Sequence, residues 1–222
     1  MTKDDILAAI RQAIIDGNAE QTEKACVSAI EAGVDVADIL NEGMTKAMQI
    51  VGDKWENKEY FLPDVLASAQ AIKAGSAYLK PQGSSGVQEH DHVGTVVIGT
   101  VKGDVHNIGK NIVALFLEVA GFKVYDLGEN VPAEQFVQAA LEHSADIVGS
   151  SAFVTSVASE MIGIEEGLKA AGVRDKVFTM IGGCVLDAEW AAKIGADAFG
   201  KDAMHAVKLA QAFMAKKKAG AL

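Results

Sequence analysis

The stretch at residues 94–111, GTVVIGTVKGDVHNIGKN, constrains the fold of this chain most strongly. Residues 95–101 form an apolar, β-branched run of strand length, and apolar residues recur at helical spacing from Ile108 onward. Residues 103–107 are therefore predicted to form a tight strand-to-helix loop. Because such loops lie beyond the carboxyl ends of the strands in an open parallel sheet, Asp104 and His106 are predicted to lie at a ligand site.

The same alternation of strand and helix continues to the end of the chain. Strands are predicted at 95–101, 123–127, 146–151, 177–181 and 197–199, and helices from 108 and at 133–143, 156–171, 187–193 and 203–217. Five strand–helix units predict a doubly wound, flavodoxin-like (Rossmann-like) α/β domain with five parallel strands in the order 2-1-3-4-5. Because the switch point of that order lies between the first and third strands, the His106 loop should face the loop at 150–155.

The first part of the chain has a purely helical pattern. Thr2 and Asp5 resemble a capping box, and Pro63 suits the first turn of a helix. Four amphipathic helices are predicted, from Thr2 to Gly17, at 18–32, from 35 through 51, and from 63 to about 79. The predicted organisation is an all-α four-helix bundle at 1–79, a polar linker at 80–93 and the α/β domain at 94–222.

Three aromatic residues stand in the polar connection predicted between the third and fourth helices, at 52–63. They are Trp55, Tyr60 and Phe61. Large apolar groups on a loop must cover something, and the pattern alone favours the interpretation that they plug the end of the bundle.

Composition limits the classes of partner. The chain has 222 residues and a net charge of −10, which argues against a nucleic-acid partner because binding to phosphates relies on Lys and Arg. No apolar run approaches the ~20 residues of a membrane span, and the first residues lack the pattern of a signal peptide. We therefore expect a cytoplasmic protein without a membrane partner. Cys26 and Cys184 lie far apart, so neither a zinc site nor a disulfide is expected.

Several chemistries compete for the loop at 103–109. A phosphate loop would need glycine where Asp104 stands and a hydroxyl where Asn111 stands, and a dinucleotide fingerprint would need a different glycine spacing. Asp104 lies close enough in sequence to accept a hydrogen bond from His106, as carboxylates do for metal-binding histidines. On the pattern alone, a helix cap with an exposed histidine and a ligand site remain equally open.

The run Asp104-Val105-His106-Asn107-Ile108-Gly109 resembles the Asp-x-His-x-x-Gly signature of cobalamin-binding domains. In that family the histidine replaces the nucleotide base as the lower ligand of cobalt. The resemblance implies that His106 is the axial cobalt ligand of a base-off corrinoid. It also assigns Asp104, Asn107, Ile108 and Gly109 to the loop that binds the cofactor.

The resemblance extends to the loops after the third and fourth strands. It implies that Ser151, Thr155, Gly182 and Gly183 line the channel for the displaced nucleotide tail. A response-regulator receiver has the same topology but needs an acidic residue where Ser150 and Ser151 stand. Many relatives also have a serine that hydrogen-bonds the carboxylate, and its position is occupied here by Val157. A histidine–aspartate pair without that serine is therefore expected.

The segment at 52–63 resembles the cap of methionine synthase and related corrinoid proteins. The resemblance implies that Trp55 and Leu62 cover the upper face of the cobalt. The family more often has phenylalanine at the first of these positions.

The order and length of these parts resemble the free-standing corrinoid proteins of anaerobic methyltransferase systems. The resemblance implies a methyl carrier whose cobalt receives a methyl upper ligand from a substrate-specific corrinoid methyltransferase. An acceptor methyltransferase then passes the methyl group to tetrahydrofolate or a thiol, and a reductive activation protein is a further implied partner. The chain would be a carrier subunit, not an enzyme by itself. The alternatives are a cobalamin-binding sensor and the cobalamin subunit of a radical mutase.

Overall fold

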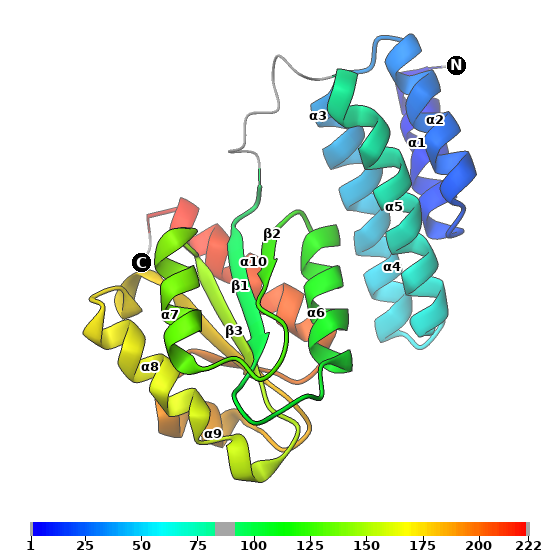
Figure 1. Cartoon of the computed structure of the whole chain (residues 1–222). Helices are drawn as coiled ribbons and strands as arrows, with labels where there is room; N and C mark the ends of the chain where they lie inside the picture. The colour runs from blue at the N-terminus through cyan, green and yellow to red at the C-terminus, as the bar shows by residue number, and fades with distance from the viewer. Residues whose placement is uncertain (1, 83–91, 221–222) are drawn as a thin grey trace. The chain divides into compact units, whose positions relative to one another are not determined.

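The computed structural model describes residues 2–82 and 92–220, and the chain divides into two compact units between Asp91 and His92 (Figure 1). The first unit is helical, and the second contains a parallel sheet with helices on both faces. This is the fold class predicted from the sequence. Most of the predicted linker lies outside the described residues, although residues 80–82 are the last part of a helix.

The helical unit begins with two helices whose ends follow the sequence signals. Helix α1 (Lys3–Ile15) starts with the capping box of Thr2 and Asp5. Gly17 adopts φ +66° in the turn that follows, a conformation that glycine reaches without a steric penalty. Helix α2 (Ala19–Glu31) is capped by the Asn18 side chain. The apolar stripe of α1 is buried, at Ile6, Leu7, Ile10, Ala13 and Ile14.

The third predicted helix exists, but it contains a π-helical segment. Helix α3 (Val36–Asp38) continues into the π-helix η1 (Ile39–Thr45) and then into α4 (Lys46–Glu56). Gly43 lies in η1, where an added Cβ would be 3.2 Å from Ile10 Cγ2 of α1. The π geometry changes the backbone pairing, and the Arg11 guanidinium donates a hydrogen bond of 2.8 Å to the Glu42 carbonyl.

The predicted connection at 52–63 is shorter than the sequence suggested. Helix α4 runs on to Glu56, so Trp55 lies in its last turn rather than in a loop, and α5 (Leu62–Gln82) begins one residue before Pro63. No proline precedes position 63 in this segment, so nothing in the backbone stops α4 earlier. The Tyr60 hydroxyl donates to the Ile15 carbonyl at 2.9 Å, and that contact ties the connection to the end of α1.

The second unit contains a five-stranded parallel sheet in the predicted order β2-β1-β3-β4-β5. The strands are β1 (Thr95–Thr100), β2 (Lys123–Asp126), β3 (Ile147–Ser151), β4 (Phe178–Gly182) and β5 (Ala198–Gly200). β1, β3 and β4 are almost fully buried, which explains why they read as apolar runs instead of alternating.

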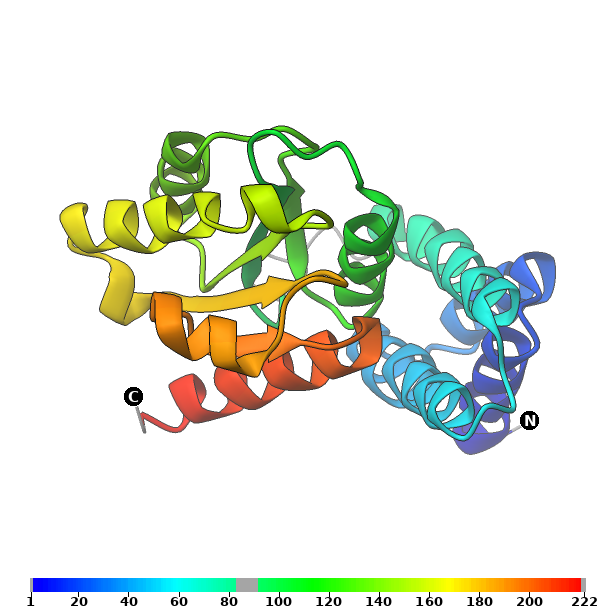
Figure 2. The ribbon, with the colours of Figure 1, turned by 90° about the horizontal axis from the view of Figure 1, so that it is seen from below.

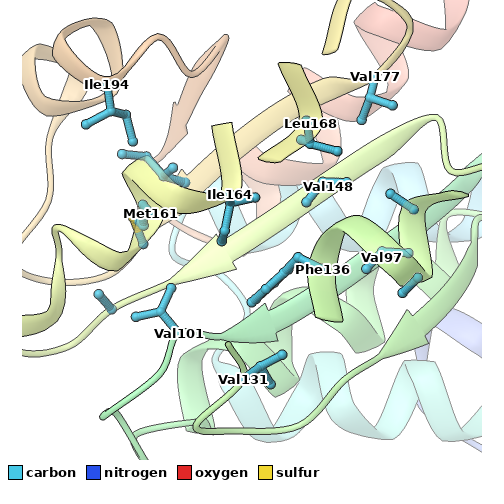
Figure 3. Packing of buried hydrophobic residues seen from close by; sticks show 14 of the residues in the cluster. Val97, Val101, Val131, Phe136, Val148, Met161, Ile164, Leu168, Val177 and Ile194 are labelled. Atoms are coloured by element: carbon cyan, nitrogen blue, oxygen red, sulfur yellow. The ribbon is translucent and has the colours of Figure 1, made fainter. Parts of the chain in front are cut away.

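Helices cover both faces of this sheet (Figure 2). They are α6 (Ile108–Val119), α7 (Ala133–Glu142), α8 (Glu160–Ala170), α9 (Ala188–Ile194) and α10 (Ala203–Lys218), with short 3-10 turns η2 (Thr155–Val157) and η3 (Arg174–Lys176). Helices α6 and α10 pack against each other, and α7 packs on α8. One core joins β1 and β3 to α7, α8 and α9, with Phe136 fully buried beside Val97 and Val148 (Figure 3).

The carboxyl ends of the strands form one side of the sheet, here called its carboxyl edge, and small side chains line it. The strand register aligns Thr100, Ser151, Gly182 and Gly200 in one row across four strands. Figure 2 looks toward this edge, where the loops after the strands meet. The first of those loops contains His106. Among the described residues, no helix is long and apolar enough to cross a membrane.

Candidate functional site

The loop after β1 contains the residues of the Asp-x-His motif. It turns at Gly103, whose φ of +83° lies in the left-handed region that favours glycine. Asp104 follows with its side chain fully buried, whereas the His106 side chain is 50% exposed. The loop thus buries the carboxylate and leaves the imidazole accessible.

Asp104 is held by three hydrogen bonds. Its Oδ1 accepts from the His106 backbone N–H at 2.9 Å and lies 2.7 Å from His106 Nδ1, and its Oδ2 accepts from the Phe153 N–H at 2.5 Å. Burial acts to raise the pKa of this carboxyl, but the bonds from Phe153 and His106 outweigh burial and lower the pKa below its ordinary value. Asp104 is therefore an anion at neutral pH.

The charge on Asp104 determines the tautomer of a neutral His106. An ionised carboxylate can only accept hydrogen bonds, so the Nδ1 atom 2.7 Å away must carry the proton. Nε2 then keeps its lone pair. A half-exposed imidazole with a free Nε2 and a carboxylate behind Nδ1 is the arrangement that metal-binding histidines use.

Exposed apolar side chains lie next to His106. Val105 is 61% exposed, Ile108 is 76% exposed and Phe153 is 48% exposed. The Phe153 ring stacks on the imidazole at 4.4 Å between centroids. Neighbouring exposed apolar groups mark a surface that covers or is covered by something. Sequence reasoning did not select Phe153, although an aromatic residue in the loop predicted to face His106 was a usable signal.

The loops after β1 and β3 meet as the topology predicted. Phe153 and Ala152 follow β3, and the Phe153 contacts to Asp104 and His106 join the two loops directly. Ser151 Oγ lies 2.9 Å from Thr100 Oγ1, so its hydroxyl bridges β1 and β3 at the carboxyl edge. Thr155 is exposed at the start of η2.

The loop after β4 approaches the loop after β3 very closely. Gly183 has φ +134°, and an added Cβ would lie 1.9 Å from the Ala152 carbonyl oxygen. A Cβ on Gly182 would lie 3.4 Å from the Gly200 carbonyl. The absence of side chains at these two glycines lets the backbones of β3, β4 and β5 end close together.

Val157 occupies the position where many relatives have a serine that hydrogen-bonds the carboxylate. An added Cβ at Gly103 would lie 3.1 Å from Val157 Cγ1, so this side chain contacts the histidine loop. Valine offers no hydroxyl, and the second oxygen of Asp104 accepts from the Phe153 backbone instead. The structure thus contains the expected His106–Asp104 pair. The chain of hydrogen bonds from His106 through Asp104 stops at the backbone N–H of Phe153.

Asn107 and Gly109 open helix α6. The Asn107 amide donates to Glu129 Oε2 at 2.6 Å, so it reaches into the loop after β2 and makes no side-chain cap for its own helix. An added Cβ at Gly109 would meet no atom within 4 Å. The contact of Asn107 with Glu129 was not anticipated, because spacing in sequence does not show that these two loops meet.

Trp55 and Leu62 belong to the helical unit. Both are half-buried, Trp55 at the end of α4 and Leu62 at the start of α5. Phe61, between them in the chain, is 66% exposed. The tip that joins α4 to α5 therefore presents an aromatic ring to its surroundings, and the interpretation that all three aromatics plug the bundle is wrong for Phe61.

Protein-family models match both units of the chain. A family model described as B12 binding domain matches residues 94–208, and a second model with the same description matches residues 6–80. The two matched regions fall in the α/β unit and the helical unit.

Curated relatives match over almost their whole length. The chain is 43% identical over 213 residues to trimethylamine corrinoid protein 1 of Methanosarcina acetivorans, with 96% of this chain and 99% of that protein covered. It is 39% identical to the dimethylamine corrinoid protein of Methanosarcina barkeri, covering 97% of this chain and all of that protein.

Two solved structures resemble the whole chain. A chain in the crystal structure of the methanol:cobalamin methyltransferase complex MtaBC from Methanosarcina barkeri matches with a TM-score of 0.87 and 30% identity, over 96% of this chain and 81% of that chain. A cobalamin-binding protein from Desulfitobacterium hafniense matches with a TM-score of 0.75 and 31% identity, over 93% and 98% of the two chains. The chain therefore belongs to the corrinoid proteins, the B12-binding methyl carriers of methyltransferase systems, and has their helical cap and their B12-binding domain.

Proposed function

We propose that this chain binds its corrinoid base-off, with His106 Nε2 as the lower ligand, and carries methyl groups from a methylamine-specific methyltransferase. The observation that supports this most directly is the His106–Asp104 pair at 2.7 Å. Because Asp104 holds the proton of the imidazole on Nδ1, Nε2 is available to cobalt.

The residues around His106 suit a flat, largely apolar macrocycle. Val105 and Ile108 expose apolar surface before and after His106 in the sequence, and the exposed Phe153 ring stacks on the imidazole. A cofactor lying on them would remove that surface from water, which favours binding by about 25 cal/mol per Å². The bound corrinoid supplies a cobalt centre that accepts and releases a methyl group.

The small residues of the carboxyl edge suit the nucleotide tail of a base-off cofactor. Ser151, Thr155, Gly182 and Gly183 stand on the loops after β3 and β4. The hydroxyl groups of Ser151 and Thr155 can bond a polar chain, and Gly182 and Gly183 add no side chain that a ligand would have to avoid. Asn107, Ile108 and Gly109 complete the proposed binding loop on the other side of His106.

With the corrinoid bound, Nε2 of His106 would hold the cobalt, and this bond would have to form and break during methyl transfer. The chain supports such a cycle because Asp104 holds the ring through Nδ1 and the backbone through the His106 N–H. When Nε2 is released, both contacts remain. The imidazole therefore stays oriented for the next binding event.

The cap supplies the proposed cover of the reactive face. Trp55 and Leu62 flank the α4–α5 connection, and the exposed Phe61 adds a third apolar side chain there. We infer that this tip excludes water and oxidants from the upper ligand position.

The names of the relatives indicate the methyl donor and the partners. Trimethylamine and dimethylamine corrinoid proteins align along nearly the whole chain, which favours a methylamine as the methyl source. The similarity to a chain of a methyltransferase complex favours direct docking on a substrate:corrinoid methyltransferase. An acceptor methyltransferase, using tetrahydrofolate or a thiol, and a reductive activation protein complete the proposed system.

Electron paramagnetic resonance of the cobalt(II) form tests the ligand. The chain is reconstituted anaerobically with and without nitrogen-15 histidine, and the nitrogen splitting should change with the label. The splitting should disappear in His106→Ala and persist in His143→Ala, a matched control in the same unit whose ring stacks on Tyr125. A wild-type spectrum that the label leaves unchanged would sink the proposal.

A transfer assay tests the donor. The reduced holoprotein is mixed with trimethylamine and a trimethylamine-specific methyltransferase, and formation of the methylated cofactor is followed by its absorbance. Methanol with its own methyltransferase serves as the comparison. Faster methylation from methanol than from any methylamine would contradict the proposed substrate class.

A further inference from the structure

The loop between β2 and α7, residues 127–131, holds the backbone of the histidine loop. The Asn130 N–H donates to the Asp104 carbonyl at 2.9 Å. The Gly103 N–H in turn donates to Asn130 Oδ1 at 2.8 Å. One residue therefore binds two successive residues of the loop, once through its backbone and once through its side chain.

The neighbouring residue makes a contact on the other side of His106. Glu129 Oε2 accepts from the Asn107 amide at 2.6 Å. The loop after β2 thus meets the histidine loop before and after the imidazole. Asp104 orients the ring, whereas Asn130 and Glu129 hold the backbone from which the ring extends.

The loop after β2 is itself well anchored. The Thr100 N–H donates to the Gly128 carbonyl at 2.9 Å, and the Val131 N–H donates to the Thr100 carbonyl at 3.0 Å. Lys110, whose side chain is 1% exposed, donates to both carboxylate oxygens of Asp126 at 2.5 and 2.6 Å. These contacts tie the loop to β1 and to α6, the two elements that flank the histidine loop.

Asn130 keeps a backbone conformation that most residues avoid. Its φ of +54° lies in the left-handed region, where glycine has no penalty and asparagine a moderate one. Glycine would fit this backbone but would offer no acceptor to the Gly103 N–H. Asparagine fits this position because it tolerates the left-handed backbone and also supplies an acceptor for the Gly103 N–H.

We propose that Asn130 is a positioning residue for the lower ligand, with Glu129 as a second support. It holds the histidine loop so that Nε2 of His106 returns to one place each time it is released. This inference rests on the proposed role of His106 as the cobalt ligand. Asn130 itself does not touch the reacting atoms.

The test compares Asn130→Gly and Asn130→Asp with a matched control, Ser144→Gly. Ser144 also has a left-handed backbone, φ +49°, but lies between α7 and β3, far along the chain from the histidine loop. Both glycine variants relieve the same kind of strain, and only Asn130→Gly removes the acceptor of the Gly103 N–H. Asn130→Asp keeps the acceptor and tolerates the conformation.

The first readout is the fraction of the cobalt(II) spectrum that shows histidine nitrogen splitting. In Asn130→Gly the equilibrium constant for binding of His106 to cobalt should fall by about tenfold. This is the lower end of the loss that follows when a residue supporting a metal ligand is removed. Asn130→Asp should restore it, and Ser144→Gly should match the wild type. An unchanged constant in Asn130→Gly, or an equal fall in Ser144→Gly, would overturn the proposal.

The second readout needs no cofactor. The His106 amide donates to Asp104, and its hydrogen exchange should accelerate about tenfold in Asn130→Gly because the loop loses the same order. In Asn130→Asp the exchange rate should return toward that of the wild type. Unchanged exchange would count against the proposal. If the wild-type holoprotein lacks histidine splitting, the proposed function fails, while this exchange experiment still decides whether Asn130 orders the loop.

Discussion

The two edges of the same sheet hold buried carboxylates in different ways. At the carboxyl edge, Asp104 accepts from two backbone N–H groups and lies beside the His106 imidazole. At the amino edge, Glu165 of α8 is 3% exposed and pairs with Arg174, whose guanidinium also donates to the Gly195 carbonyl at 2.6 Å and pairs with Asp197 at 3.1 Å. One carboxylate is held by backbone groups and the other by a cation.

The pKa values of the two carboxyls move in opposite directions. Burial raises the pKa of Glu165 above its ordinary value even though Thr179 and Arg174 bond to it. The bonds at Asp104 outweigh burial and lower its pKa. The amino-edge network thus joins α8 and η3 to the connection between α9 and β5, whereas the carboxyl-edge pair orients a half-exposed imidazole.

Breaking the amino-edge network should have the largest effect on stability. Arg174→Met leaves Glu165 buried without its cation, which costs about 3–5 kcal/mol of unfolding free energy. Urea unfolding of the cofactor-free chain measures this loss, and the cobalt(II) spectrum of the folded holoprotein should keep its histidine splitting. The double variant Glu165→Met/Arg174→Met should recover most of the stability, because an apolar pair has no buried charge. A double variant as unstable as Arg174→Met would contradict this account.

Removing the charge at the carboxyl edge should cost less stability but change the cofactor site. Asp104→Asn places an amide opposite the N–H groups that donate to the carboxylate, and the free energy of unfolding should fall by about 1–3 kcal/mol. Corrinoid affinity should fall by roughly 10–100-fold because the ligand loses its carboxylate. Equilibrium binding of the corrinoid measures this fall. Arg174→Met provides the contrast, since its folded fraction should bind with wild-type affinity.

The two carboxyls should give opposite pH dependences. Asp104 contributes stability that is present above its ordinary pKa of 3.8 and is lost as the pH falls through its lowered folded pKa. Glu165 contributes stability that is present below its ordinary pKa of 4.5 and is lost as the pH rises through its raised folded pKa.

The free energy of unfolding, measured between about pH 3 and pH 7, should therefore change differently with pH in the two variants. This range includes the ordinary pKa values of both carboxyl groups. The deficit of Asp104→Asn relative to the wild type should shrink toward acid pH. The deficit of Glu165→Gln should shrink toward neutral pH. Parallel pH profiles for the two variants would refute the assigned directions.

The smallest expected effect concerns the Phe153 ring, which stacks on His106. Phe153→Leu keeps the backbone N–H that Asp104 accepts and removes only the aromatic contact with His106. Stability should fall by about 0.5–1.5 kcal/mol. The histidine splitting should persist with a broader line, because the imidazole is less restricted. Loss of the splitting altogether would show that Phe153 does more than orient the ring.

Much of the fold was predictable because the strands are buried on both faces. β1 was predicted at 95–101 and lies at Thr95–Thr100, and β4 was predicted at 177–181 and lies at Phe178–Gly182. Buried parallel strands are apolar throughout and are separated by helices, so their number and order follow from pattern and topology. In the cap, the end of α4 was missed because the helix continues through Gly52, where the connection was predicted to begin.

The candidate site was predictable only where its residues are neighbours in sequence. Asp104 and His106 are two residues apart, so their pairing could be anticipated, as could the meeting of their loop with the loop after β3. The contacts of Phe153 with the imidazole and of Asn130 with Gly103 join residues 47 and 27 positions apart. No local spacing encodes which side chain of a facing loop reaches the site.

The sequence alone was enough to predict the alternation of elements, the strand order and the pairing of Asp104 with His106, because apolar periodicity and a short motif are local properties. Only the tertiary structure decided which tautomer His106 adopts and what holds its loop in place. Those features depend on a buried carboxylate that Phe153 caps and on Asn130, which reaches across from the neighbouring strand's loop. Burial and hydrogen-bond geometry arise only when distant segments pack together, and here they orient the imidazole of a histidine that stands in a loop.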